Sequence, residues 1–140
     1  LKLALPKADI RTVVVSLQFD LNPEFHFQLG KALAPLRRES VLIIGSGMSF
    51  HNLGSMLSGR NSPESNEFDI WLTDTVEGEP QRRKDLLCNW KQAPNARESH
   101  PREEHLAPLF VACGAAEEEH GKQVFSDRVL GAQVSAFRFG

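Results

Sequence analysis

The sequence predicts an α/β fold in which a mostly parallel or mixed central sheet is flanked by helices. Two apolar runs, residues 12–19 and 41–44, have the β-branched composition of strands buried on both faces. A helical pattern lies between them, which gives a β-α-β unit with parallel strands and a right-handed crossover. The chain also closes with an apolar and polar mixture typical of one or two strands. We therefore expect strands near residues 12–19, 41–47 and 133–139.

The first predicted helix begins where Asn22 can serve as N-cap and Pro23 as the first helical residue. It runs to about Arg38, and Pro35 should kink or shorten its last turn. Its apolar residues have helical spacing: Phe25, Leu29, Ala32, Leu33 and Leu36. Residues 1–11 resemble the end of an earlier element followed by a turn.

Three further helices are expected after a polar loop at residues 54–62. The first opens at Ser62-Pro63 and ends before Gly78, and the second holds Leu86, Leu87 and Trp90 on one stripe. Residues 91–101 form a loop, and Pro101 begins the last helix. The apolar residues of that helix follow the i, i+3, i+4, i+7 pattern: Leu106, Leu109, Phe110 and Cys113.

The length and composition indicate one globular domain, or part of one, over residues 1–140. Hydrophobic residues make up 41% of the chain, and its net charge of -2 gives no sign of a nucleic-acid or membrane partner. Cys88 and Cys113 are too few for a disulfide framework and lack the spacing of a metal site. No apolar run is long enough for a membrane-spanning helix. We therefore expect a cytoplasmic protein.

The run at 41–44 leads directly into Gly45-Ser46-Gly47, and His51 follows four residues later. Open α/β sheets place ligands just beyond the carboxyl ends of their strands. The turn does not match the dinucleotide fingerprint, because Phe50 stands where the third glycine belongs. It does not match a nucleophile elbow either, because Ile44 stands where that motif needs glycine. His51 could thus be a proton shuttle, a metal ligand or a packed side chain.

The other histidines are weaker candidates on spacing alone. His26 lies between two phenylalanines in the first helix and reads as a packed residue, and His120 follows three glutamates at the surface. His100 and His105 are five residues apart, so a helix would separate them by about 140°. At most one of them could then reach a shared ion, and His100 before Pro101 reads as a helix N-cap.

Taken together, these residues resemble the class III extradiol ring-cleavage dioxygenases, in the branch of the 4,5-DOPA dioxygenases. Three stretches carry the resemblance: the strand and helix from Val13 to Arg37, the His-Asn-Leu motif at 51–53, and the Glu-His-Leu-x-Pro-Leu motif at 104–109. The last strand at 134–140 is also similar. The resemblance covers essentially all 140 residues and implies the C-terminal half of the family fold.

The resemblance implies roles for two histidines. His51 is expected to be the catalytic residue that acts at the substrate, and it could also ligate the ion in a substrate-free, zinc-bound site. His105 is expected at the metal. The family's remaining ligands lie in its N-terminal half, one of them in a His-Gly-Ser-Pro motif that this sequence does not contain. The missing N-terminal half is therefore an expected partner, and this chain alone is expected to be inactive.

The implied reaction is the insertion of O2 into a catechol-type, DOPA-like aromatic at a non-heme metal centre. Fe(II) is expected for activity, Zn(II) could occupy the isolated protein, and no organic cofactor is needed. Two alternatives stay open at this point. One is a zinc-binding, catalytically idle relative of the family, and the other is a phosphate- or nucleotide-binding α/β domain that uses Gly45-Ser46-Gly47.

Overall fold

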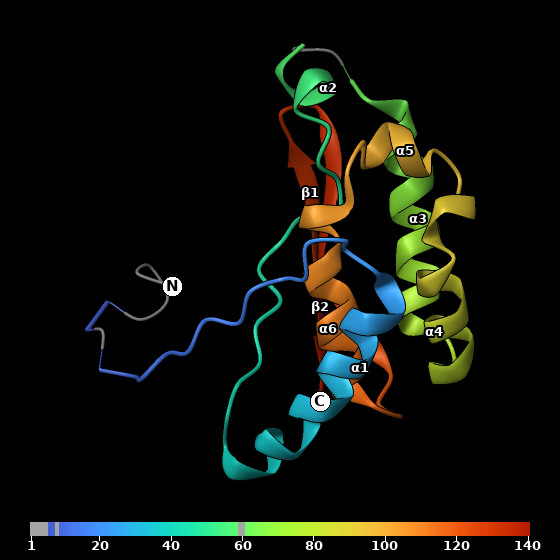
Figure 1. The fold of residues 1–140 in the computed structure, drawn as a ribbon. Coiled ribbons are helices and arrows are strands. Elements are labelled where there is room, and N and C mark those ends of the chain that lie inside the picture. Colours follow the sequence, from blue (N-terminus) through green and yellow to red (C-terminus); the bar gives the residue numbers. More distant parts are fainter. Residues whose placement is uncertain (1–5, 8, 59–60) are drawn as a thin grey trace.

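A computed structural model describes residues 6–7, 9–58 and 61–140, and its fold is shown in Figure 1. Helices that pack on one another and on a β-hairpin form the body. The elements in chain order are α1 (Pro23–Leu33), η1 (a 3₁₀ helix, Ala34–Glu39), α2 (Leu53–Leu57), α3 (Pro63–Glu77), α4 (Pro80–Cys88), η2 (3₁₀, Trp90–Gln92), α5 (Ala96–Ser99), η3 (3₁₀, Glu103–His105), α6 (Ala107–Ala116), β1 (Gly121–Val129) and β2 (Ala132–Phe139). The end of an earlier element and the turn were expected at residues 1–11, and residues 1–5 and 8 of that segment lie outside the described residues.

Within the described residues the sheet consists of two antiparallel strands, β1 and β2. The strand expected near 133–139 is β2, and that part of the prediction is confirmed. The hairpin turns through Leu130 and Gly131, whose φ angles of 50° and 83° are those of a two-residue type I′ loop. The predicted central sheet is not confirmed.

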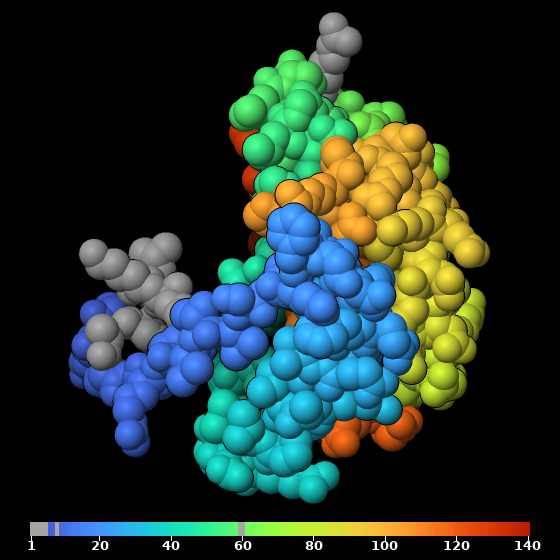
Figure 2. Space-filling view, in the orientation of Figure 1, coloured from blue at the N-terminus to red at the C-terminus, as the bar shows by residue number. Residues whose placement is uncertain are grey.

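Residues 12–19 and 41–47 are extended but unpaired in the described structure, so the expected parallel β-α-β pairing is absent there. Val13 and Val14 are each 87% exposed and Leu42 is 80% exposed. Figure 2 shows residues 9–19 reaching away from the body. An apolar run indicates that its residues favour burial, but a strand also needs a hydrogen-bonded neighbour. The described chain supplies none for these two segments.

The start of α1 follows the predicted capping. Asn22 Oδ1 accepts a hydrogen bond from Phe25 N at 3.0 Å, and Pro23 occupies the first turn, where a missing N–H costs nothing. The helix gives way to the 3₁₀ turn η1 at Ala34, next to Pro35. The expected disturbance at this proline is therefore confirmed.

The later helices differ from the prediction in their boundaries. The helix expected to begin at Pro101 begins as α6 at Ala107 and is preceded by the short turn η3. The expected loop at 91–101 contains η2 and α5, and the loop at 54–62, of which residues 59–60 are not described, overlaps α2. Short turns of this kind have too few residues to leave a periodic pattern.

Helices α1 and α6 approach each other closely because glycines meet at their crossing. A Cβ atom on Gly30 would collide with the carbonyl oxygen of Val111, and one on Gly114 would collide with the carbonyl oxygen of Phe27. Beside this contact Phe27 stacks on Phe110, with ring centroids 6.2 Å apart. The crossing therefore leaves no room for a side chain at either glycine.

The main core lies between α1, α3, α4 and α6, and a smaller cluster lies under the hairpin. Members of the main core include Phe27, Phe68, Leu72, Val76, Leu87, Trp90, Leu106 and Phe110. The smaller cluster joins Phe50 and Met56 to Ala132 and Val134 of β2. It pins the segment before His51 to the hairpin.

A buried arginine, Arg83, lies at the end of the core where α6 leads into β1. Arg83 is 1% exposed, and its guanidinium donates to the carbonyl oxygens of Glu119 at 2.8 Å and Glu117 at 3.1 Å. The same group lies 5.1 Å from the ring centroid of Phe139, within cation–π range. It thus fixes the link between α6 and β1.

None of the helices in the described ranges combines the length and hydropathy that a bilayer crossing requires.

Replacing Gly30 by Ala should destabilise the fold strongly, because the added methyl group would meet backbone rather than a movable side chain. We expect a loss of roughly 2 kcal/mol or more in the free energy of unfolding. Gly54→Ala is the matched control, since a Cβ atom there would meet only Asn52 Oδ1 at 3.4 Å. Urea unfolding followed by circular dichroism measures both. Equal stability of the two variants would contradict the close crossing.

His100 should make the stability depend on pH. Its ring is buried between Phe68 and Trp90, and burial lowers the pKa of His100 from 6.5 to about 4. Between these values the unfolded chain binds a proton that the folded chain does not. The free energy of unfolding should therefore be fully retained above about pH 6.5 and fall, by roughly 3 kcal/mol in all, as the pH drops towards 4. Urea titrations should show this component in the natural chain and not in His100→Gln; identical pH profiles would contradict it.

Candidate functional site

Two segments that are far apart in the sequence lie directly against each other at the candidate site. Met48 N donates to the carbonyl oxygen of His105 at 2.9 Å, and His51 N donates to that of Ser99 at 3.0 Å. Gly47 makes this approach possible, because a Cβ atom there would collide with the His105 carbonyl oxygen. The glycine-flanked turn thus serves to bring residues 47–51 onto residues 99–105.

His51 and His105 are in ring contact across this junction. Their ring centroids are 3.5 Å apart and the ring planes are tilted by 32°. Both side chains are half-buried. The two histidines that the family resemblance singles out therefore lie together, while their individual roles stay predictions.

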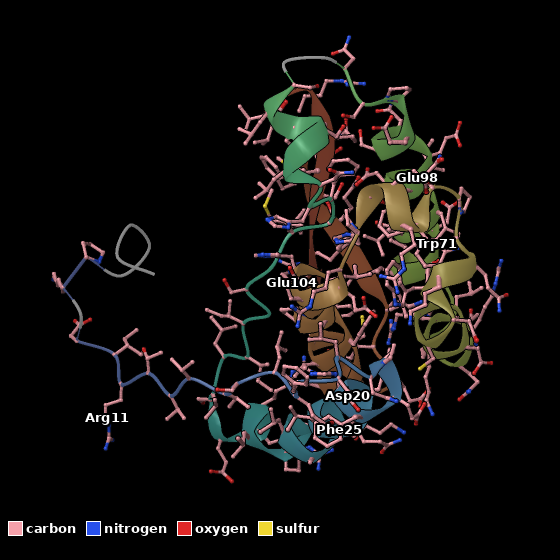
Figure 3. All side chains as sticks on the ribbon, turned by 45° about the horizontal axis from the view of Figure 1, so that its top comes forward. Arg11, Asp20, Phe25, Trp71, Glu98 and Glu104 are labelled. Carbon is pink, nitrogen blue, oxygen red and sulfur yellow. The ribbon has the colours of Figure 1, made fainter. Side chains whose placement is uncertain are left out.

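Glu104, which the sequence did not lead us to expect at the site, completes a group of three possible metal ligands. One potential donor atom from each of His51, Glu104 and His105 lies within 4.8 Å of the others. Figure 3 shows Glu104 beside the extended segment that leads to His51. The available signal was the acidic residue directly before His105 in the Glu-Glu-His sequence at 103–105.

The three side chains fit a divalent transition metal. Two imidazoles and one carboxylate with open positions are the donor set typical of non-heme Fe(II) oxygenases. Glu104 Oε2 is buried and has no hydrogen-bond partner among the described residues, although Arg102 Nε lies 3.5 Å away. Arg102 supplies a counter-charge to this oxygen, and the Glu104 side chain is 38% exposed, so the fit to a metal rests on the donor set of the three side chains.

The surroundings keep the imidazole of His51 neutral. Burial lowers the pKa of His51, and positive charge on His105 lowers it further, while the carboxylate of Glu104 acts in the opposite direction. A neutral imidazole carries a free electron pair on one ring nitrogen. It can therefore bind a metal or accept a proton near neutral pH.

Neighbouring hydrogen bonds hold the chain on both sides of His51. Asn52 caps α2 by accepting from Ser55 N at 3.1 Å, and its Nδ2 donates to the carbonyl oxygen of Glu98 at 2.7 Å. On the other side, Ser49 Oγ accepts a hydrogen bond from Ser135 N of β2 at 2.7 Å. The His-Asn-Leu motif thus contributes an anchoring asparagine as well as a histidine.

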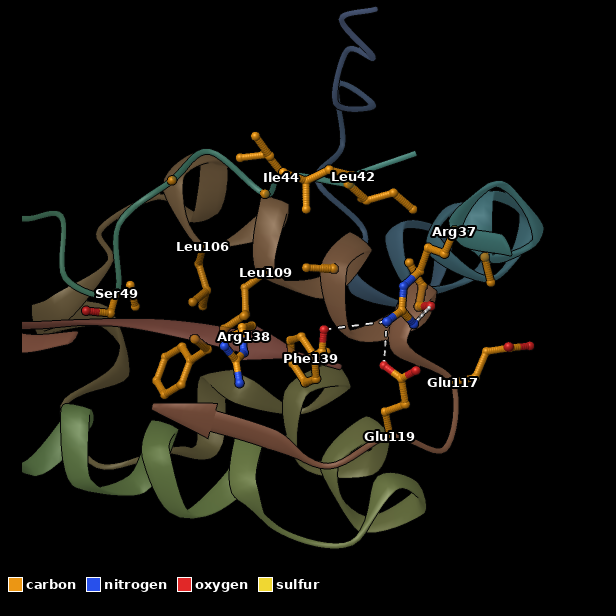
Figure 4. Close-up of a pocket in the computed structure, with 18 of the residues that line it drawn as sticks. Arg37, Leu42, Ile44, Ser49, Leu106, Leu109, Glu117, Glu119, Arg138 and Phe139 are labelled. Carbon is orange, nitrogen blue, oxygen red and sulfur yellow. Dashed lines mark hydrogen bonds and ion pairs between the residues drawn. The ribbon is translucent and has the colours of Figure 1, made fainter. Parts of the chain in front are cut away.

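A cavity of about 710 Å³, lined by both apolar and charged side chains, runs from His105 along the extended segment (Figure 4). The segment 41–49 forms one wall, and α6 and β2 form the others. His105 lines it, and Arg37, which is paired with Glu119 and donates to the Phe139 carbonyl oxygen at 3.5 Å, borders the cavity too. The apolar lining includes Leu42, Ile44, Leu106, Leu109 and Phe139.

The remaining histidines lie outside the three-residue group. His26 is buried in α1, where its Nδ1 lies 2.7 Å from the Asn22 carbonyl oxygen. His120 is exposed, as expected. His100 is the C-cap of α5 rather than a helix N-cap, and its side chain lies in the core.

The glycines of the 45–47 turn are accounted for by packing. A Cβ atom on Gly45 would press on the carbonyl oxygen of Pro108, just as one on Gly47 would press on that of His105. Carbonyl oxygens facing this turn would repel an anion. No observation here therefore favours the phosphate- or nucleotide-binding alternative.

Comparison with known proteins finds relatives that are named dioxygenases. The family described as the catalytic LigB subunit of aromatic ring-opening dioxygenase matches residues 2–138. Dioxygenase tasH of Hapsidospora irregularis is 36% identical over 153 residues, which cover 99% of this chain and 46% of that protein. The 4,5-DOPA dioxygenase extradiol of Mirabilis jalapa is 42% identical over 113 residues, 79% of this chain and 42% of its own length. The chain thus spans less than half of each of these relatives.

The fold has a solved counterpart. The crystal structure of an uncharacterized protein from Escherichia coli K12 matches with a TM-score of 0.82 and 26% sequence identity, covering 94% of this chain and 55% of the other. The structural match and the match to the family each cover nearly all of the chain. The chain belongs to the family of catalytic LigB subunits of aromatic ring-opening dioxygenases.

Proposed function

We propose that this chain is part of an extradiol dioxygenase that inserts O2 into a catechol-type, DOPA-like aromatic at a non-heme metal centre. The observation that carries the proposal is the meeting of His51, Glu104 and His105 in a chain of this family. The relatives named 4,5-DOPA dioxygenase extradiol support the substrate class. Fe(II) is the metal expected for activity, and Zn(II) can take the same ligands.

We assign different roles to the three residues. His105 and Glu104 hold the metal, and a bound Fe(II) supplies a Lewis acid at which catechol and O2 can bind. His51 takes the proton of a catechol hydroxyl and returns it later in the reaction, because its neutral imidazole can accept and release protons near pH 7. In the substrate-free site His51 can also serve as a ligand.

We further propose that the remainder of the complete protein covers the exposed apolar surface of this chain. The chain spans less than half of its relatives, and its segments 12–19 and 41–47 have strand-like sequences without a strand partner in the described residues. Apolar side chains line the neighbouring cavity. An added polypeptide with extended apolar segments would pair with these segments and complete the sheet and the metal site.

A zinc-binding, catalytically idle relative is the second candidate, because the same three ligands suit Zn(II). The two functions differ in their bound metal and in turnover. Bound Fe(II) with O2 uptake in the presence of DOPA supports the dioxygenase. Bound zinc without any uptake, also after reconstitution with Fe(II), supports the idle relative.

Ligand variants should separate the roles of the histidines. His105→Ala should weaken Zn(II) binding about 100-fold or more, equivalent to about 2.8 kcal/mol. The variant removes a metal ligand whose main chain is held in place by the hydrogen bond from Met48 N. His51→Ala should retain substantial binding, and Glu104→Gln should lie between them. His120→Ala is the control, since His120 is an exposed histidine outside the group. Competition with a chromophoric chelator measures all four; equal affinities for the His105→Ala and His120→Ala chains would exclude the proposed centre.

The chain of 140 residues alone should not cleave catechols, whereas the complete protein should. The isolated chain should also self-associate, because Val13, Val14 and Leu42 are exposed. O2 uptake with DOPA measures the activity, and sedimentation velocity measures the association. In the complete protein His51→Ala should abolish uptake while metal remains bound. Robust turnover by the isolated chain, or by a complete protein carrying His105→Ala, would contradict this assignment.

A further inference from the structure

His100 is an unusual histidine for this fold, because it is fully buried and yet makes a long-range polar contact. Its exposed fraction is 0%, and the rings of Phe68 and Trp90 lie around it, with centroids 5.3 Å and 6.0 Å away. Nε2 lies 2.9 Å from the carbonyl oxygen of Ser49. Because a carbonyl oxygen only accepts, Nε2 must carry the proton and donate it.

The contact reaches the segment that carries His51. Ser49 is itself 7% exposed, so its carbonyl oxygen is shielded from water and needs a donor from the protein. The next residue, Phe50, is 1% exposed and packs in the smaller cluster against β2. Residues 49 and 50 are therefore held from two sides, by His100 and by the hairpin.

The hydrogen bond from His100 lies between the two backbone hydrogen bonds that join residues 47–51 to residues 99–105. Met48 N donates to His105 and His51 N donates to Ser99, on either side of the Ser49 carbonyl that His100 holds. Removing the central bond would leave residues 49 and 50 held only by the hairpin, through the Ser49 hydroxyl and the Phe50 ring, and would let the imidazole of His51 shift relative to His105. The two backbone bonds restrain only the ends of the segment and the hairpin contacts restrain its side chains, whereas His100 restrains the Ser49 carbonyl group itself.

We propose that His100 is a positioning residue, which holds His51 against His105 and Glu104 through its hydrogen bond to the Ser49 carbonyl oxygen. It does not touch the metal or the substrate. The proposal rests on the proposed metal centre only for its effect on zinc binding; the packing of His51 on His105 is independent of any metal.

Two amide variants test the hydrogen bond itself. In His100→Gln the side-chain NH2 occupies nearly the place of Nε2 and still reaches the Ser49 carbonyl oxygen, whereas in His100→Asn it is too short. The two variants have similar polarity, so their difference reports the hydrogen bond. His26→Asn is the matched control, because His26 is equally buried and hydrogen-bonded but lies in α1. The 140-residue chain is used throughout, with thermal unfolding as the measure of stability.

Two readouts are compared at matched stability. The first is the nuclear Overhauser effect between the rings of His51 and His105 in the metal-free chain, which should be lost in H100N and retained in H100Q and H26N. The second is the dissociation constant for Zn(II) alone, which should rise in H100N no further than it does in His51→Ala, and should stay within roughly threefold in the other two.

The outcomes separate this inference from the proposed function. Absence of zinc binding in the natural chain would overturn the metal centre, while the ring contact would still decide the role of His100. An unchanged ring contact in H100N, or equal losses in H100N and H26N, would overturn the positioning role. If H100N does not fold, H100Q decides: a folded H100Q chain without the ring contact overturns the proposal, and one that keeps it supports it.

Discussion

The backbone contact between residues 47–51 and 99–105 is the constraint on which the candidate site depends. It needs a glycine at 47, because the chain passes so close to the His105 carbonyl oxygen that a side chain has no place. Once the contact exists, His51 and His105 must face each other although they belong to no common helix or strand. The positions of the site residues are thus set by main-chain packing more than by the rotamers of the histidines.

The apolar side chains of the helical core are buried, whereas most of those in the extended segments are exposed. Phe68, Leu72 and Phe110 are 0% exposed and fill a continuous core, and Arg83 satisfies the carbonyl groups at its end. By contrast, Val13 and Leu42 have the sequence of core residues and the exposure of surface residues. The described residues therefore combine a packed layer of helices with two extended apolar segments that have no strand partner, and the site lies where the two meet.

Local signals in the sequence predicted the features that depend on neighbouring residues. The Asn22-Pro23 cap, the disturbance at Pro35 and the final strand all follow from nearby chemistry and are confirmed. The central sheet could not be predicted reliably, because strand pairing depends on residues elsewhere. The nearness of His51 and His105 came from the family resemblance. Glu104 was not predicted because the Glu-His-Leu-x-Pro-Leu motif indicated a metal role only for its histidine. The buried position of His100 was not predicted because a residue before a proline is typical of a helix N-cap.

Exposed extended backbone also has a consequence for handling the protein. Proteases bind their substrates as extended strands, and residues 9–19 present such a strand with little side-chain protection. The glycine crossing of α1 and α6 lies just beyond it and is tightly packed. Limited digestion would therefore remove the first segment and stop near Asn22, where the helical body begins.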